Sequence, residues 1–239
     1  MAEIYYLIIV IILFSTIQSI FGVGLLLFGT PTLLLSGYSY SETLWLLLPC
    51  SVVISLIQVV GEYELIQAKK KAVYLIIPVL VLSLTLVLVY DSTLNITKIV
   101  GSMLLMIGSV KFSSKLQIFL RFIIKNHLQV YYIMIGAVHG VSNMGGGPLS
   151  ILMSNVYSTK ERIRANIAFI YLILAMFQIF ILYIISKNDF QNRTFILILV
   201  SLVTYLFVNK FISKKINNKR YLVLLNTIVL IYGLLAVIK

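Results

Sequence analysis

Long apolar segments alternate with short polar segments along the whole chain. The longest apolar segments approach the ~20 residues that an α-helix needs to cross the hydrocarbon of a bilayer. They are Ile4 to Ile20, Leu44 to Val60, Ala72 to Tyr90, Ile167 to Ile185 and Tyr221 to Ile238. Shorter candidates are Ile96 to Val110, Gln129 to Val138 and Thr194 to Val208. This pattern predicts an all-α integral membrane protein that crosses the membrane several times.

Composition supports the same class. Hydrophobic residues make up 61% of the 239 residues, charged residues only 11%, and the mean hydropathy is +1.06. A soluble domain carries roughly 25% charged residues, because its surface must meet water. A cleaved signal peptide is an alternative for the first apolar segment, but that segment follows Glu3 without a basic region and leads into further membrane sequence. The single cysteine, Cys50, excludes an internal disulfide and argues against a thiolate metal site.

The positive charge of the chain is concentrated in the polar segments. A net charge of +12 could suggest nucleic acid as a partner. Most basic residues, however, occur in short clusters between apolar segments, and cytoplasmic loops of membrane proteins are enriched in Lys and Arg. We therefore place these clusters in the cytoplasm, with both termini outside, and expect the lipid bilayer rather than nucleic acid as partner. The inner clusters are Lys69 to Lys71, Lys111 to Lys125, Lys160 to Arg164 and Lys210 to Arg220.

Glycine and proline interrupt two of the apolar stretches. Residues 130–157 lie between two inner clusters, so this stretch must enter and leave the membrane from the same side. Glycine and proline break helices, and the middle of the stretch contains Gly136, Gly140, Gly145, Gly146, Gly147 and Pro148. A similar break near the N-terminus contains Gly22, Gly24, Gly29 and Pro31. We predict a broken helical hairpin at each place, the first opening to the outside and the second to the inside.

The two halves of the chain resemble each other. Gly22-Val23 is similar to Gly140-Val141, Gly29-Thr30-Pro31 is similar to Gly146-Gly147-Pro148, and Gln58 matches Gln178. Coincidence is the alternative in a sequence dominated by Leu and Ile. With opposite predicted orientations, the halves give the inverted-repeat design of many secondary transporters. The predicted fold is therefore two inverted-topology repeats, each a broken helical hairpin followed by three transmembrane helices. The first repeat covers 1–110, a basic cytoplasmic linker covers 111–128, and the second repeat covers 129–239.

The glycine-rich breaks are candidate binding sites. Irregular backbone at membrane depth is tolerated only where protein or water satisfies it. A helix starting at Pro148 would aim free N–H groups and its positive dipole end at the break, and such a helix end binds anions. Thr30 and Pro31 could repeat this arrangement, with the Thr30 hydroxyl as cap. The alternative is that these glycines only let helices pack closely. The candidate substrate-binding residues are Ser142, Asn143, Gly145, Gly146, Gly147, Pro148, Gly22, Gly24, Gly29, Thr30, Pro31, Gln58 and Gln178.

Other polar residues near the breaks have two interpretations each. Gln58 and Gln178 could bind a ligand or a neighbouring helix. His139 could be a proton carrier, although a single histidine is more often a packed polar residue. Arg164 could draw anions toward the second hairpin, but an ordinary positive-inside residue is the better interpretation.

Nothing in the sequence points to catalysis. The chain has no phosphate-binding P-loop, HExxH zinc motif or GxSxG elbow, and its acidic residues fall in predicted loops or at segment ends. We therefore expect no catalytic residue, no metal and no cofactor. An intramembrane enzyme and a membrane partner subunit without its own transport site are the alternatives to a transporter. A homo-oligomer is left open.

Two parts of the sequence carry a family resemblance. Gly140 to Pro148 is followed by Arg164-Ala165-Asn166, and Asn209-Lys210 leads through Lys219-Arg220 to Gly233-Leu234-Leu235. With these segments the chain resembles the sulfite exporter TauE/SafE family of membrane permeases over nearly its whole length. The first break departs from the family's glycine cluster, because Leu25 to Phe28 separate Gly24 from Gly29. The resemblance implies a multi-pass protein of the cell membrane that moves sulfite, an organosulfonate or a related sulfur anion. We expect alternating access between the two hairpins.

Overall fold

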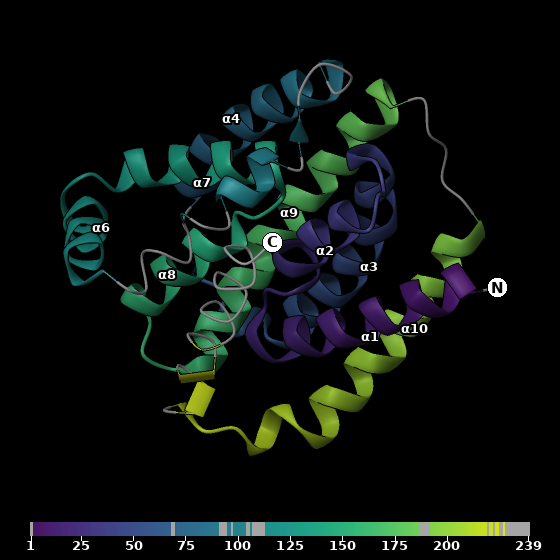
Figure 1. The fold of residues 1–239 in the computed structure, drawn as a ribbon. Helices are drawn as coiled ribbons and strands as arrows, with labels where there is room; N and C mark the ends of the chain where they lie inside the picture. The colour runs from purple at the N-terminus through teal and green to yellow at the C-terminus, as the bar shows by residue number, and fades with distance from the viewer. Residues whose placement is uncertain are drawn as a thin grey trace.

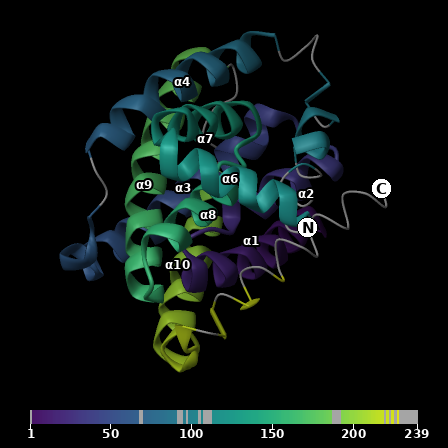
Figure 2. The ribbon, with the colours of Figure 1, turned by 90° about the vertical axis from the view of Figure 1, so that its left-hand side faces the viewer.

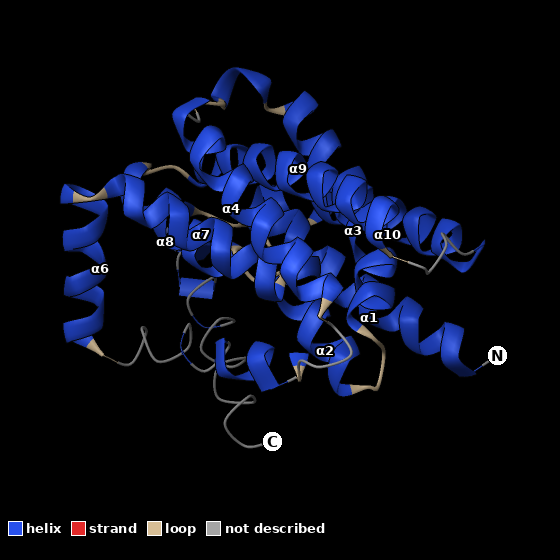
Figure 3. Ribbon diagram, turned by 90° about the horizontal axis from the view of Figure 1, so that it is seen from above, coloured by secondary structure: helices blue, strands red, loops and turns tan. Residues whose placement is uncertain are grey.

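The computed structural model describes residues 2–67, 70–90, 113–186 and 192–218, with shorter pieces between 95 and 106 and between 220 and 227. Within these residues the chain forms helices joined by short loops, and none of them forms a strand (Figure 3). The prediction of an all-α protein is confirmed.

The first half begins with a helix that ends in a short break. Helix α1 covers Ala2–Phe21, a π-helical turn η1 covers Leu25–Gly29, and α2 covers Thr30–Leu35. Helix α3 covers Tyr40–Gly61, a 3-10 turn η2 covers Tyr63–Leu65, and α4 covers Lys70–Val89. The Ser39 side chain accepts a hydrogen bond from the Glu42 backbone at 3.3 Å and so caps α3. Serine followed three residues later by glutamate is the capping-box pattern that starts a helix.

The second half begins with an additional helix and then follows a similar order. Helix α6 covers Ser114–Asn126, α7 covers Leu128–Ser142 and α8 covers Gly146–Val156. Helix α9 covers Lys160–Ile185, α10 covers Asn192–Phe211, and a 3-10 turn η3 covers Ser213–Lys215. A long helix, a break, a short helix and further long helices thus occur in both halves.

Among the residues that the structure describes, five helices are long and apolar enough to span a membrane. They run over Glu3–Phe21, Tyr40–Gly61, Ala72–Val89, Lys160–Ile185 and Asn192–Phe211. Their outer faces expose large apolar side chains such as Ile9, Tyr183 and Val203, as a lipid-facing surface requires. These spans confirm most of the predicted membrane segments. The predicted segments Ile96 to Val110 and Tyr221 to Ile238 lie largely outside the described residues.

Helices α3 and α9 form the centre of the molecule. They pack against each other, and Figure 1 shows α9 crossing the molecule beside α3. Helix α4 packs on α7 and α9, while α10 packs on α1 and α3. Helices α1, α3 and α4 of the first half therefore contact α7, α9 and α10 of the second half.

Helix α6 stands apart from this core. It lies at the edge of the molecule and faces the viewer in Figure 2, and it packs on α7. The Ser113 side chain caps it by accepting a hydrogen bond from the Leu116 backbone at 3.3 Å. Ile118, Phe119 and Phe122 on this helix are exposed. The predicted basic linker, 111–128, therefore contains a helix over Ser114–Asn126.

Candidate functional site

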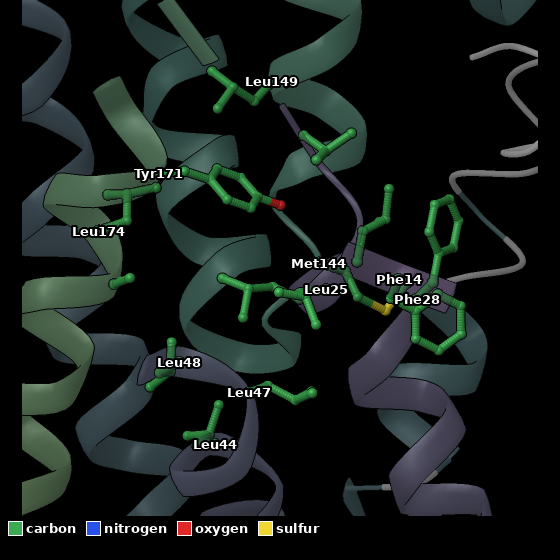
Figure 4. Packing of buried hydrophobic residues seen from close by; sticks show 14 of the residues in the cluster. Phe14, Leu25, Phe28, Leu44, Leu47, Leu48, Met144, Leu149, Tyr171 and Leu174 are labelled. Atoms are coloured by element: carbon green, nitrogen blue, oxygen red, sulfur yellow. The ribbon is translucent and has the colours of Figure 1, made fainter. Parts of the chain in front are cut away.

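The two helix breaks meet in the buried interior. The first break is Gly22 to Gly24, between α1 and η1, and the second is Asn143 to Gly145, between α7 and α8. Asn143 Nδ2 donates a hydrogen bond of 2.9 Å to Thr30 Oγ1, and both side chains are fully buried. Figure 4 shows Leu25 and Met144 from the two segments close to Phe14 and Phe28. Residues from both halves thus build one site, which we call the central site: Thr30, His139, Asn143, Tyr171 and Gln178.

Both breaks begin with a residue in the left-handed backbone region. Gly22 has φ 77° and Asn143 has φ 61°. Each of these residues also closes its helix with the same backbone bond, from Gly22 N–H to Gln18 O and from Asn143 N–H to His139 O, each at 2.8 Å. Glycine and asparagine are the residues that adopt this conformation most readily at helix C-termini.

The backbone donors of the second break are already hydrogen-bonded. Gly145 N–H donates to His139 Nδ1 at 3.2 Å, Met144 N–H to Ser142 Oγ at 3.3 Å, and Gly147 N–H to Met144 O at 3.1 Å. The expectation of uncovered amides at this break therefore does not hold in this conformation. Helix α8 also begins at Gly146 rather than at Pro148. Proline still lies in the first turn, where its missing N–H costs nothing.

The glycines of the second break are surrounded on all sides. A Cβ added at Gly146 would overlap the Tyr171 hydroxyl and would approach Val23 to 3.1 Å. A Cβ at Gly145 would approach His139 Cβ to 2.6 Å. Close approach of α9 to the start of α8 therefore requires glycine at these positions.

Three polar side chains of the central site lie together. The His139 and Tyr171 rings are 5.4 Å apart between centroids, and the Gln178 amide lies beside the His139 ring. Gln178 Nε2 donates to Asn143 Oδ1 at 3.2 Å. Figure 4 shows the Tyr171 side chain of α9 among the buried apolar residues of the interior. Tyr171 is absent from the sequence-based candidates, because a tyrosine within an apolar run gives no sign of which break it faces.

A glutamine occupies the corresponding place before the first break. Gln18 Oε1 accepts from Leu25 N–H at 3.1 Å, and Gln18 Nε2 donates to Ser51 Oγ at 3.0 Å and to Ser55 Oγ at 3.3 Å. Gln18 bonds the backbone of the first break as His139 bonds that of the second. The sequence prediction missed it, although a polar residue four positions before Gly22 was a usable signal.

Three predicted residues of the first break lie inside a helical segment. Gly29 has φ −65° and ψ −41°, and α2 begins at Thr30 directly after η1. The prediction that the Thr30 hydroxyl caps a helix is wrong, because α2 has no side-chain cap and the hydroxyl accepts from Asn143 instead. A Cβ at Gly29 would approach Leu47 to 3.0 Å, which fits a packing role. Pro31 lies in the first turn of α2, where proline is tolerated.

Other predicted residues also hold helices together. Gln58 Nε2 donates to the carbonyls of Gln18 and Ser19 at 3.2 Å each, near the end of α1. Gly136 and Gly140, predicted within the second break, lie inside α7. There a Cβ would approach the α4 backbone, at 2.6 Å from Ile76 O for the first and 2.7 Å from Leu80 O for the second.

A charged cluster joins the ends of four helices on the predicted cytoplasmic side. The Arg164 side chain is only 12% exposed and forms an ion pair with Glu62. Its Nη1 also donates to Ser19 O at 3.2 Å and to Ser213 Oγ at 2.6 Å. Arg164 therefore lies in the first turns of α9 as a buried, multiply hydrogen-bonded residue. We call Glu62, Arg164, Asn209 and Ser213 the inner cluster.

The inner cluster borders an open cavity of ≈ 320 Å³. The cavity is lined by Ile20, Gly61, Glu62, Lys160, Glu161, Arg164, Tyr205, Asn209, Ser213, Ile216 and Tyr221. It reaches close to the first break, because a Cβ at Gly22 would lie 3.1 Å from Arg164 O.

A second charged cluster lies at the other end. Arg193 forms ion pairs with Glu3 and Glu42, and the Tyr38 hydroxyl donates to Glu3 at 3.1 Å. Burial and, to a lesser extent, this hydrogen bond raise the pKa of Tyr38 to about 12. We call Glu3, Tyr38, Glu42 and Arg193 the outer cluster. It ties the starts of α1, α3 and α10 together.

These features define a class of protein. The described residues form a multi-pass helical membrane protein with two broken helices that meet in its interior, and no group of three or more metal-binding side chains occurs among them. The sequence matches the Sulfite exporter TauE/SafE family over residues 7–236, and the chain belongs to this family. It is therefore a membrane permease of a family that exports sulfite and related sulfur compounds. Neither the curated proteins nor the solved structures contain a significant match.

Proposed function

We propose that this permease moves a small oxyanion, sulfite or an organosulfonate, through the central site by alternating access. The observation that carries the proposal is the Asn143 to Thr30 hydrogen bond, which joins the second break to the start of α2 in the first half, inside a membrane protein of a sulfur-anion permease family. Irregular backbone at this depth is costly and is typical of transporter binding sites.

The chemistry of the central site suits transient binding. Its side chains are neutral hydroxyl, amide and imidazole groups. A buried lysine or arginine would hold an anion tightly and slow its release. Backbone N–H groups at the start of α8 would bind substrate by exchanging their present partners, among them His139 Nδ1.

The packing of the helices supports an inverted repeat. The contacts of α4 with α7 and of α10 with α1 are the same pairing with the halves exchanged, and so are those of α4 with α9 and of α10 with α3. Gly22 and Asn143 begin the two breaks with the same backbone conformation. If Gly22 corresponds to Asn143, then Gly24 corresponds to Gly145. This alignment of the halves differs from the sequence comparison, which paired Gly22 with Gly140. A pseudo-two-fold axis relating the halves would exchange outward-open and inward-open states.

The inner cavity is the proposed cytoplasmic entrance. It lies among basic segments that the positive-inside rule assigns to the cytoplasm, and it ends next to the first break. The inner and outer clusters close the two ends of the molecule by tying helices of both halves together. Opening toward one side would require the cluster on that side to separate.

The membrane potential can drive export without a coupling ion. A potential that is negative inside favours expulsion of an anion by ~2.3 kcal/mol per charge per 100 mV. His139 remains a proposed proton carrier, but protonation of its Nδ1 would break the hydrogen bond that this atom accepts from Gly145 N–H. Proton movement is not needed for the transport that we propose.

Flux in proteoliposomes tests this function. Labelled sulfite should enter or leave under an imposed potential, saturate with concentration and be competed by organosulfonates. Gly146→Ala should abolish flux, because its Cβ overlaps the Tyr171 hydroxyl. Gly101→Ala is the matched control, since a Cβ there meets no atom within 4 Å and Gly101 does not line the inner cavity. Movement of only a cation or a neutral solute would overturn the proposal.

A further inference from the structure

Arg164 uses the two edges of its guanidinium group differently. Nη1 donates to Ser19 O at 3.2 Å, to Ser213 Oγ at 2.6 Å and to Asn209 Oδ1 at 3.4 Å. These partners belong to α1, η3 and α10 and fix the position of the group. Nε and Nη2 both donate to the carboxylate of Glu62, the first at 3.3 Å. The second edge therefore holds one carboxylate and nothing that anchors the arginine elsewhere.

The edge that holds Glu62 is the edge with which arginine binds oxyanions. Its two N–H groups form a planar fork that matches two oxygens of a carboxylate or of another oxyanion. Glu62 thus occupies the position that a sulfite or sulfonate group would take on Arg164. The guanidinium group would stay in place after such an exchange, because Nη1 keeps its own partners.

The position of Glu62 keeps such an exchange local. Glu62 follows Gly61, the last residue of α3, and its backbone is no longer helical, with φ −126° and ψ 27°. Its side chain is 15% exposed and lines the inner cavity together with Arg164. A water molecule takes about 30 Å³ in the liquid, so a cavity of ≈ 320 Å³ has room for a small hydrated anion. An anion in the cavity can therefore meet Arg164, and Glu62 can leave it by changing its rotamer.

The charges around the inner cavity balance as long as Glu62 holds Arg164. Among the described residues, the lining contains two basic ones, Lys160 and Arg164, and two acidic ones, Glu62 and Glu161. Lys160 lies 3.6 Å from Glu161 and is paired with it. An added anion thus finds an unpaired cation only after Glu62 has released Arg164. Glu62 therefore lowers the affinity of the cavity for anions.

Resting on the function proposed above, we infer that Arg164 is the cytoplasmic binding residue for the oxyanion substrate and that Glu62 is its built-in competitor. Binding of a sulfite or sulfonate group to the fork of Arg164 displaces Glu62. Because this ion pair ties the end of α3 to α9, the displacement also releases the inner cluster. Return of Glu62 to Arg164 frees the anion, so the arginine does not trap the substrate.

Uptake of labelled sulfite into inside-out membrane vesicles tests the inference, because these vesicles present the cytoplasmic side to the substrate. Glu62→Gln keeps the shape of the side chain and removes its charge. We expect the KM for sulfite to fall roughly fivefold, since one modest ion pair no longer competes with the substrate. Glu64→Gln is the matched control: it removes the same charge two residues away, from an exposed side chain that does not line the cavity, and should leave the KM unchanged.

Arg164→Lys tests the fork itself and does not depend on the glutamine variant. A lysine can still pair with Glu62, but its ammonium group lacks the planar fork. We expect the KM for sulfite to rise roughly tenfold, because the two parallel bonds to the oxyanion are lost. Thermal unfolding in detergent shows which variants have kept their fold. An unchanged KM in a folded Arg164→Lys protein would overturn the inference.

The remaining outcomes separate the two proposals. Sulfite uptake with a KM that Glu62→Gln leaves unchanged or raises would leave the transport function standing and overturn the competition by Glu62. An equal fall in KM for Glu62→Gln and Glu64→Gln would also overturn it, since the effect would then be one of general charge. Absence of uptake of every sulfur anion by the unaltered protein would reject the transport function itself, and this inference with it.

Discussion

Asn143 combines two tasks in one residue. Its backbone adopts the left-handed conformation that ends α7, and its amide bonds both Thr30 and Gln178. Asparagine tolerates this conformation better than most residues with a Cβ. The same residue therefore sets the position of the second break and links it to the first half.

Substitutions at Asn143 can separate these tasks. Asn143→Gly keeps the backbone conformation and loses the amide, whereas Asn143→Ala loses the amide and also strains the backbone. We expect both variants to lose transport, and the alanine variant to be less stable than the glycine variant by about 1 kcal/mol. Thermal unfolding in detergent and flux in proteoliposomes measure the two effects. Equal stability of the two variants would contradict the role given to the backbone.

His139→Gln tests the proton role of this residue apart from its structural role. In the first half Gln18 already bonds a break backbone through its side-chain oxygen, so a glutamine at position 139 can accept from Gly145 in the same way. We expect the variant to fold and to retain potential-driven flux. If only the unaltered protein responded to an imposed pH gradient, His139 would be a proton carrier after all.

At the scale of elements, segment length and hydropathy were sufficient to predict α1, α3, α4, α9 and α10. A spanning helix needs little more than a long apolar run, because its backbone satisfies itself within the lipid. Details of the first break were not predictable in the same way. Gly29 and Pro31 look like helix breakers, yet the chain stays helical there because η1 leads directly into α2 and proline is tolerated in a first turn.

The residues at the two breaks and the central site divide along a similar line. Asn143, Gly145 and Gly146 were predicted because the glycine-rich sequence marks a break by itself. Tyr171 and Gln18 were not, because their roles depend on which face of a helix meets which break. Tertiary packing determines which helix face meets which break, and the sequence of an apolar segment contains little information about this packing.

The inner cluster should be a coupled unit that holds four helix ends. Arg164 bonds Glu62, Ser19 O and Ser213, so Arg164→Gln should destabilise the protein more than Glu62→Gln. We expect the double variant to show a coupling of about 0.5–3 kcal/mol between the two residues. A double-mutant cycle of thermal stability measures it, and additive effects would mean that the ion pair contributes nothing.

At the scale of the whole molecule, the predicted orientation assigns opposite sides to the two charged clusters. Exposed positions near each end allow a direct test. Single cysteines at Ser158 and Asn217 should be inaccessible to an impermeant thiol reagent in intact cells. Both positions lie beside basic segments, Lys160 to Arg164 and Lys210 to Arg220, that the positive-inside rule assigns to the cytoplasm. A cysteine at Ser36 should be labelled from outside. Native Cys50 is buried and should stay unlabelled. Labelling of Ser158→Cys in sealed cells would reverse the orientation.

The packing of helices from one half on helices of the other half has a consequence for synthesis. Helix α1 finds its partner α10, and α4 finds α7, only after the other half has been made. A ribosome adds roughly 5–20 residues per second, so α1 waits on the order of ten seconds or longer for α10. During that time the face of α1 that packs on α10 lacks its native neighbour. A nascent first half should therefore be a client of membrane insertases and a target of quality-control proteases, and a ribosome stalled between the halves should leave a fragment that is quickly degraded.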